Sequence, residues 1–188
     1  MSSPPGEPAW VGDVLEFWFH EIGERGWYSG GPDVDVRVRE RFAALHARVA
    51  AGTEEFDASR PRDLLAAIIV LDQFSRHLHR GTAAAFAGDS MACHLARTAV
   101  EQHLDAGLTS AERQFLYMPL QHSEDRANQA LSVRLVSSLG NAEWTRYAVD
   151  HHDVIEKFGR FPHRNAVLRR ESTPAELEAL AKGVGSSW

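Results

Sequence analysis

Three short polar strings of the sequence combine the side chains that acid–base catalysis and anion binding use. They are residues 72–80, residues 121–125 and residues 158–165. Their candidate residues are Asp72, Gln73, Arg76, Arg80, His122, Glu124, Arg160, His163, Arg164 and Asn165. An imidazole beside a carboxylate transfers protons near neutral pH, and a guanidinium binds carboxylates or phosphates bidentately. The strings therefore suggest a pocket for a small anionic molecule.

The string at residues 158–165 contains more polar groups than the end of a helix requires. Gly159 can supply a left-handed helix cap, and Pro162 prevents the helix from resuming. The polar residues around them have no such role in folding. We therefore expect two guanidiniums, an imidazole and an amide of this string to face a ligand.

Two further histidines have competing interpretations. His151 lies in an apolar stripe, where a single histidine is usually a hydrogen-bonded core residue. The same stripe runs into residues 158–165, which favours a functional role. Ser123 with two following acids fits a helix cap, but His122 is not explained by capping, and a helix N-terminus beside a histidine can bind an anion.

These considerations divide the candidates into two sets. The predicted catalytic residues are His122, Glu124, His151 and His163. The predicted substrate-binding residues are Asp72, Gln73, Arg76, Arg80, Arg160, Arg164 and Asn165. The position of residues 72–80 at the end of the most apolar segment argues that their polar groups are paired or line a cavity.

We predict neither a cofactor nor a metal. The sequence has no Gly-rich phosphate loop, nucleophile elbow or dinucleotide fingerprint. A metal site built from His122, His151 and His163 is the less favoured alternative, because no two of them have the four-residue spacing of a zinc helix. Cys93 falls within a predicted helix and is expected to be a small core residue, not a nucleophile.

Apolar residues recur at helical spacing through most of the chain, with no alternating run, so the predicted class is all-α. The predicted helices cover residues 10–22, 34–49, 61–80, 89–104, 109–118, 123–139, 142–158 and 173–180. Residues 64–71 are apolar almost all round, which predicts a central covered helix, with a buried strand as the rival. We expect Gly26, Gly107 and Pro119 to end helices, and Asp89 and Ser123 to cap them.

Length and composition limit the remaining possibilities. The 188 residues suit one domain, predicted over residues 10–188 after a disordered lead-in at residues 1–9. A net charge of −6 disfavours nucleic-acid binding. One cysteine, no export signal and no membrane-spanning apolar run predict a cytoplasmic protein that does not bind membranes. The oligomeric state is not predicted.

Five strings carry a resemblance to a known family. They are Leu71-Asp72-Gln73-Phe74, Arg80-Gly81-Thr82, Tyr117-Met118-Pro119-Leu120, His122-Ser123-Glu124-Asp125 and residues 158–165. In order and separation they resemble the bacterial domain-of-unknown-function family 924. The resemblance implies a tetratricopeptide-like fold of stacked antiparallel helix pairs, with about seven or eight helices. It implies little about activity.

The sequence departs from that family's usual pattern at four positions. Ser75 and His77 stand in a string where Pro-Arg-Asn is expected, Gln121 replaces a usual Glu, and Arg169 replaces a usual Gly. The change at Gln121 removes a carboxylate beside His122. If the chemistry of the family uses that acid, we expect this member to have a changed substrate or none.

Two classes of function are consistent with these residues. The first is a cofactor-independent enzyme in which arginines bind an anionic substrate and a histidine–carboxylate pair moves a proton, as in hydrolysis, elimination or isomerisation. The second is a non-catalytic helical-repeat module that binds a peptide or small anionic ligand in a groove. A facing imidazole and carboxylate in a closed pocket would favour the enzyme, and an open basic groove would favour the binding module.

Overall fold

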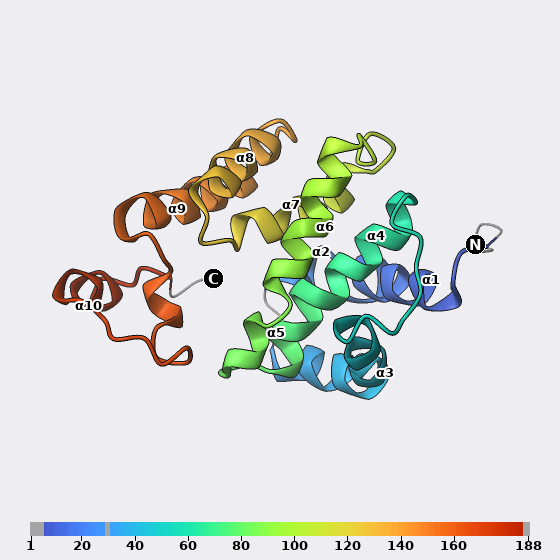
Figure 1. Ribbon diagram of the computed structural model, residues 1–188, viewed down its shortest axis with the longest axis horizontal. Helices are drawn as coiled ribbons and strands as arrows, with labels where there is room; N and C mark the ends of the chain where they lie inside the picture. Colours follow the sequence, from blue (N-terminus) through green and yellow to red (C-terminus); the bar gives the residue numbers. More distant parts are fainter. Residues whose placement is uncertain (1–5, 29–30, 186–188) are drawn as a thin grey trace.

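The computed structural model describes residues 6–28 and 31–185, and every regular element within these ranges is helical (Figure 1). The elements are α1 (Ala9–Glu16), η1 (Phe17–Ile22), α2 (Gly23–Trp27), α3 (Pro32–Ala50), α4 (Pro61–Ile68), η2 (Ile69–Phe74), α5 (Ser75–Leu78), η3 (Ala83–Phe86), α6 (Asp89–Glu101), α7 (Ser110–Gln121), α8 (Arg126–Ser137), α9 (Ala142–Phe158), η4 (Pro162–Arg164) and α10 (Pro174–Ala181). The η1 and η2 segments are π-helical, and η3 and η4 are 3₁₀ turns. The all-α prediction is confirmed.

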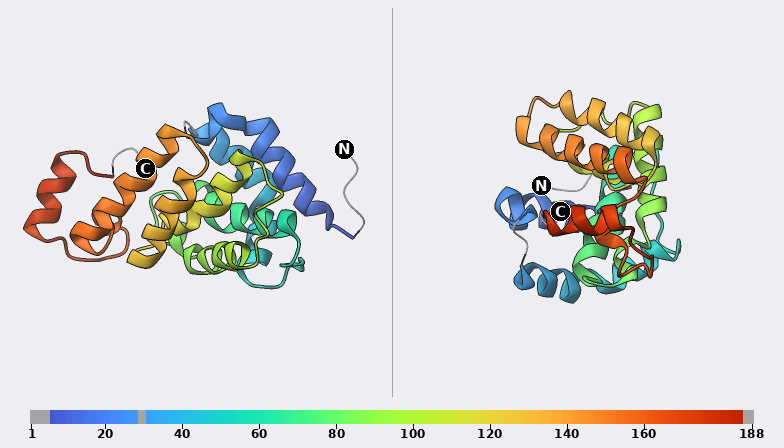
Figure 2. Two further views of the ribbon diagram at one scale, coloured as in Figure 1. Left: turned by 90° about the horizontal axis from the view of Figure 1, so that it is seen from above. Right: turned by 90° about the vertical axis from the view of Figure 1, so that its left-hand side faces the viewer.

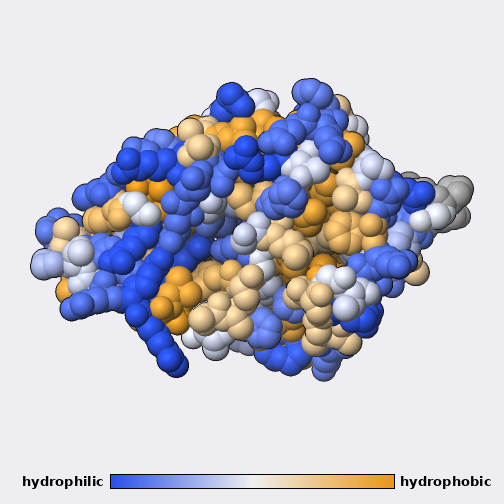
Figure 3. All heavy atoms as spheres, viewed as in Figure 1, coloured by the Kyte–Doolittle hydropathy of each residue, from blue (hydrophilic) through white to orange (hydrophobic). Residues whose placement is uncertain are grey.

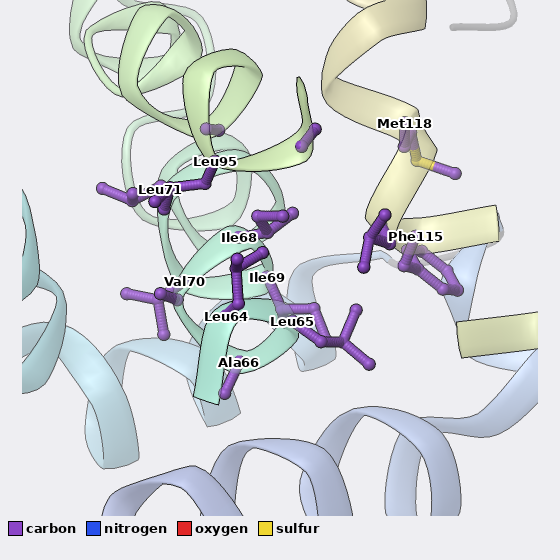
Figure 4. Close-up of a cluster of buried hydrophobic side chains, with 14 of the residues drawn as sticks. Leu64, Leu65, Ala66, Ile68, Ile69, Val70, Leu71, Leu95, Phe115 and Met118 are labelled. Carbon is purple, nitrogen blue, oxygen red and sulfur yellow. The ribbon is translucent and has the colours of Figure 1, made fainter. Parts of the chain in front are cut away.

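The centre of the fold is the continuous helix formed by α4 and η2. Its residues 64–74 are all buried, which confirms the covered helix and rules out the rival strand. Apolar side chains project from it toward α6 and α7, where Leu95 and Phe115 meet them (Figure 4). Burial of each large aliphatic side chain contributes about 1.5–3 kcal/mol, so this helix anchors the core.

The polar residues that follow the central helix are positioned by its π turn. A π turn contains one residue more than an α turn, which shifts the faces that the following side chains occupy. In η2 this shift occurs over Ile69–Phe74, the segment that contains Asp72 and Gln73. Both side chains are buried, so the polar string begins inside the protein and not at a solvated helix end.

Several predicted helix ends are confirmed by their caps. Asn141 accepts hydrogen bonds from the first-turn amides of α9, and Gly159 ends the helix with φ +70°. Thr109 and Thr173 each form a capping box with the glutamate three residues later, opening α7 and α10.

Other predicted helix ends are wrong. Gly26 lies inside α2, which continues to Trp27. Pro119 lies inside α7, which continues to Gln121, because a proline removes only its own N–H from the helix ladder. Asp125 caps α8 by accepting from the Asn128 amide, so Ser123 is not the cap.

The predicted ends of the helix at residues 89–104 are also wrong. Gly88 occupies the cap position of α6, and Asp89 is its first residue. The helix ends at Glu101, well before Gly107, and a turn containing Leu104 follows. The carboxylate of Asp89 is therefore available to side chains from elsewhere in the chain.

The elements pack mainly against their neighbours in the sequence. Helices α8 and α9 lie side by side, and α10 lies at the far end from α1 and α3 (Figures 1 and 2). Hydrophilic residues predominate on the α10 side of the face in Figure 3, while hydrophobic residues gather right of its centre. No helix in the described ranges is long and apolar enough to cross a membrane.

The predicted lead-in at residues 1–9 is described in part. Residues 1–5 lie outside the described ranges. Glu7 accepts hydrogen bonds from Arg62 at 2.8 and 3.4 Å, and α1 begins at Ala9, one residue before the predicted start at Trp10.

Candidate functional site

A cavity of about 650 Å³ lies beside the polar end of the central helix. Its walls come from α2, η2, α5, η3, α7, α9 and the turn at residues 163–164. The lining residues are Trp27, Tyr28, Gln73, Arg76, His77, Arg80, Gly81, Ala85, Phe86, Gln114, Met118, Gln121, His122, Trp144, Tyr147, His151, His163 and Arg164. The cavity is large enough for a small organic molecule.

An aspartate–histidine pair joins two helices at one end of this cavity. His122 Nδ1, after the last turn of α7, lies 2.8 Å from Oδ1 of Asp72 in η2. Gln73 Nε2 donates to the second carboxylate oxygen, and Arg76 Nη1 lies 3.1 Å from Oδ1. Asp72 is completely buried, and these partners satisfy its charge.

This environment determines the protonation state of both groups. Burial alone would raise the pKa of Asp72, but the charge of Arg76 and the bond to His122 more than offset it, so the pKa of Asp72 is lowered. Burial and the nearby Arg76 charge lower the pKa of His122 below 6.5, despite the opposing effect of Asp72. At neutral pH, Asp72 is thus an acceptor and His122 a neutral ring that donates through Nδ1, which leaves Nε2 as the basic atom.

Two arginines share a carboxylate next to this pair. Asp89 accepts from Arg76 at 3.0 and 3.3 Å and from Arg164 Nη1 at 3.1 Å. The Arg164 guanidinium lies between the rings of Phe86 and Phe161, 4.6 and 4.5 Å from their centroids. Burial lowers the pKa of Arg164 to about 10, so it stays charged at neutral pH.

Two further histidines complete the polar end of the cavity. The rings of His122 and His151 are 6.1 Å apart, and His151 Nδ1 lies 2.8 Å from the Tyr147 carbonyl. Burial lowers the pKa of His151 to about 3 and that of His163 to about 4. His122, His151 and His163 are therefore neutral at pH 7. Protonation of any of them costs free energy, and a bound anion would reduce that cost.

A second aspartate–histidine pair has its histidine in the wall of the same cavity. His77 Nδ1 lies 2.7 Å from Asp35 Oδ1, and Arg80 donates to both oxygens of Asp35 at 2.8 and 2.7 Å. The Arg80 side chain is 58% exposed, so it lies on the solvent-facing side of the cavity wall. There its guanidinium pairs with Asp35. Burial lowers the pKa of His77, which packs against the Trp18 ring.

The structure brings most of the predicted site residues together. Those at the cavity or in direct contact with its lining are Asp72, Gln73, Arg76, Arg80, His122, His151, His163 and Arg164. They come from all three polar strings, which are distant in the sequence. Side chains from the three strings thus meet at one cavity, while their roles stay predictions.

Three predicted residues lie away from the cavity, in bonds that hold the C-terminal segment. Glu124 accepts the Phe161 amide at 2.8 Å and two hydrogen bonds from Arg170 at 2.7 and 2.9 Å. Arg160 donates to both oxygens of Glu176. Asn165 bonds to Ser172 and Arg170 at 3.0 Å each. In the structure these contacts join residues 158–165 to α10 and to the α7–α8 connection.

Other residues of the site were not found from the sequence. Asp89 was interpreted as a helix cap, and the aromatic residues Trp27, Trp144 and Tyr147 were not predicted to line a site. One signal was available for Gln114, which is seven residues before Gln121 and therefore on the same face of α7. The search of residues 6–28 and 31–185 gives no group of three His, Cys, Asp or Glu side chains that could hold a metal ion.

The model of a family described as "Bacterial protein of unknown function (DUF924)" matches residues 14–184. The chain belongs to this family. The chain is similar to a solved structure, that of the protein of unknown function ATU0120 from Agrobacterium tumefaciens, with 34% identity and a TM-score of 0.87 over 92% of this chain and 97% of that one. No curated protein matches the chain.

The positions at which this DUF924 member departs from the expected pattern have distinct environments. Ser75 bonds to His46, and His77 to Asp35. Gln121 is 5% exposed and lines the cavity. Arg169 has φ +54°, in the left-handed region that favours glycine, which explains why a glycine suits this position.

Proposed function

We propose that the protein is a cofactor-independent enzyme that performs acid–base chemistry on a small anionic substrate. Hydrolysis, elimination and isomerisation all fit this proposal. The observation that carries it is the 2.8 Å contact between His122 Nδ1 and Asp72 Oδ1 at the wall of the cavity. A facing imidazole and carboxylate favour catalysis over simple binding.

The proposed mechanism begins with the basic nitrogen of His122. Asp72 accepts the Nδ1 proton and fixes the ring orientation, so Nε2 can remove a proton from the substrate or from a water molecule. The imidazolium that forms is stabilised by the Asp72 charge and returns the proton later in the reaction. A positioned general base of this kind contributes about 10²–10⁴-fold in rate.

Arg76 and Arg164 are assigned to the anionic group of the substrate. Their pairing with Asp89 holds both guanidiniums in the wall of the cavity that His122 also lines. Asp89 offsets part of their charge, but each guanidinium has donors beyond those that Asp89 uses. A bound anion near the histidines would also raise their affinity for protons, which links binding to proton transfer.

We also infer that the helices follow a tetratricopeptide-like arrangement. Support comes from the short connections between α7, α8 and α9 and from the packing of each on the next. Short connections make consecutive helices antiparallel, so α7 and α9 run in the same direction. The proposed active site then lies against α7 and α9, both of which line the cavity.

The decisive experiment compares the wild type with His122→Asn and Asp72→Asn. Each protein is incubated with a mixture of small carboxylic and phosphorylated metabolites, and consumption is followed by mass spectrometry. We expect at least one anionic compound to be consumed by the wild type and not by His122→Asn. Circular dichroism verifies that His122→Asn is folded.

The alternative is the non-catalytic binding module. It is supported instead if a compound raises the melting temperature of the wild type and of His122→Asn equally, while neither protein consumes any compound. Mass action makes such stabilisation a measure of binding that requires no knowledge of chemistry.

A further inference from the structure

The side-chain oxygens of two buried glutamines in the cavity wall have no hydrogen-bond partner in the described part of the chain. Gln114 is 2% exposed and Gln121 is 5% exposed, and the Oε1 atom of each is buried and unpaired. Both line the cavity.

An unpaired buried amide costs about 1–3 kcal/mol, and native proteins retain few of them. Two in one cavity indicate that a ligand supplies the missing partners. A carboxamide oxygen accepts hydrogen bonds, so its complement is a donor such as the N–H of an amide. A purely apolar or purely anionic ligand has no such donor and would leave both oxygens unsatisfied.

The two carboxamides lie on one stripe of α7. Gln114, Met118 and Gln121 are four and three residues apart, and all three face the cavity. Seven residues at 1.5 Å each separate Gln114 from Gln121 by about 10 Å along the helix axis. A ligand that reaches both is extended along α7.

The two ends of this stripe differ in chemistry. Beyond Gln121 lie the histidines and Arg164, whose Nε is buried and makes no hydrogen bond. That donor calls for an acceptor such as a carboxylate oxygen.

The Gln114 end is aromatic. Trp27 packs on Phe115, 4.8 Å between ring centroids, and its Nε1 is fixed by the Trp18 carbonyl at 2.7 Å. Tyr28 stacks on Tyr147 at 6.5 Å, and Trp144 lies one turn before Tyr147 on α9. These rings offer faces for a planar group.

We propose that the substrate is an N-acylated amino acid or dipeptide with an aromatic group. Its carboxylate binds Arg164, its amide groups pair with Gln121 and Gln114, and its ring packs on the aromatic residues near Gln114. The proposal rests on the proposed function and specifies the substrate class of the same cavity. It places the amide groups of the ligand along α7, next to His122.

The test is calorimetric titration of the full-length wild type with N-benzoylglycylglycine. Two matched compounds each lack one end: N-acetylglycylglycine has no ring, and N-benzoylglycylglycinamide has no carboxylate. We expect the complete compound to bind, and each matched compound to bind about tenfold more weakly or worse, which corresponds to the loss of one good contact. Equal binding of all three, or no binding of any, would overturn the proposal.

The variants Gln114→Leu and Gln121→Leu separate recognition from folding. Because leucine removes an unsatisfied amide, each variant should melt at the wild-type temperature or higher, while binding N-benzoylglycylglycine about tenfold more weakly. Gln102→Leu, on the exposed end of α6, is the matched control and should bind like the wild type. A leucine variant that melts below the wild type and binds N-benzoylglycylglycine with wild-type affinity would show that the glutamine serves folding. That result contradicts the proposal.

Failure of this proposal is distinguishable from failure of the proposed function. If a His122-dependent substrate is found that carries no amide, the enzyme proposal stands and the substrate class is wrong. If N-benzoylglycylglycine binds through Gln114 and Gln121 but no His122-dependent reaction is found, the cavity binds this class of compound as proposed. The class is then a ligand and not a substrate, and the enzyme proposal fails.

Discussion

Asp72 and His122 are 50 residues apart in the sequence, yet their side chains meet at 2.8 Å inside the protein. One comes from the central helix and the other follows the last turn of α7. The contact joins two of the three polar strings, and through Arg76 and Asp89 it extends to Arg164 in the third.

Replacing Asp72 by asparagine should reduce both stability and turnover. The change removes the buried charge that Arg76 and His122 face, and breaking a buried pair typically costs about 3 kcal/mol. Urea denaturation measures this loss. The exposed Asp153→Asn is the control, expected within about 0.5 kcal/mol of the wild type. Equal stability of the two variants would show that Asp72 is not held as an ion.

Acidification from pH 7 to 5 should destabilise the protein through its buried histidines. An unfolded histidine binds a proton near pH 6.5, whereas the pKa of His151 is about 3 and that of His163 about 4. The unfolded state therefore binds more protons in this range, and the free energy of unfolding falls as the pH falls. The range from pH 7 to 5 ends above the pH at which protonation of the carboxylates lowers the free energy of unfolding.

His151→Gln should make that pH dependence weaker. Each histidine with a depressed pKa adds up to about 1.4 kcal/mol per pH unit, and glutamine removes one of them. Urea denaturation at pH 7, 6 and 5 gives the slope. The exposed His20→Gln is the matched control and should keep the wild-type slope. A His151→Gln slope equal to that of the wild type would mean that His151 is not buried in the neutral form.

Glu124→Gln should lower the stability of the folded protein without impairing ligand binding. Glu124 accepts from Arg170 and from the Phe161 amide and does not line the cavity. A partly exposed ion pair of this geometry contributes about 1 kcal/mol, which thermal denaturation can measure. A variant that is fully stable but inactive would return Glu124 to the catalytic role predicted from the sequence.

Cys93 should be unreactive in the native protein. Its side chain is buried beside Asn128, whose amide donates to the sulfur at 3.3 Å, and burial raises the pKa of the thiol. A thiol reagent should label it slowly at pH 7.5 and rapidly in 6 M guanidinium, since only the thiolate reacts. Rapid labelling of the folded protein would show that the α6 region opens.

The fold class was predictable because it depends on local patterns. The apolar run at residues 64–71 and the bounds of α9 follow from periodicity and caps, and both are confirmed. The errors at Pro119 and Ser123 have one cause: a cap or breaker residue has several local uses, and tertiary packing selects among them.

The sequence indicated which polar strings form the site, but it did not indicate which residues their side chains pair with. Sequence patterns indicated that residues 72–80, 121–125 and 158–165 carry chemistry. They could not show that Glu124 would pair with Arg170 or that Asp89 would bind two arginines, because these contacts join residues 46 and 75 positions apart, as well as nearer ones. Which charged residues pair with each other depends on distances that only the folded chain defines.

The π turn at Ile69–Phe74 makes the length of the central helix critical. A π turn contains one residue more than an α turn, so removing a single residue from it should restore regular α geometry and leave the helix beyond it in the same orientation relative to the core. Only the side chains within the turn, Asp72 and Gln73 among them, would change direction. Such a deletion should therefore break the contact between Asp72 and His122 and preserve the one between Arg76 and Asp89. The extra residue of the helix thus serves the Asp72–His122 pair in particular.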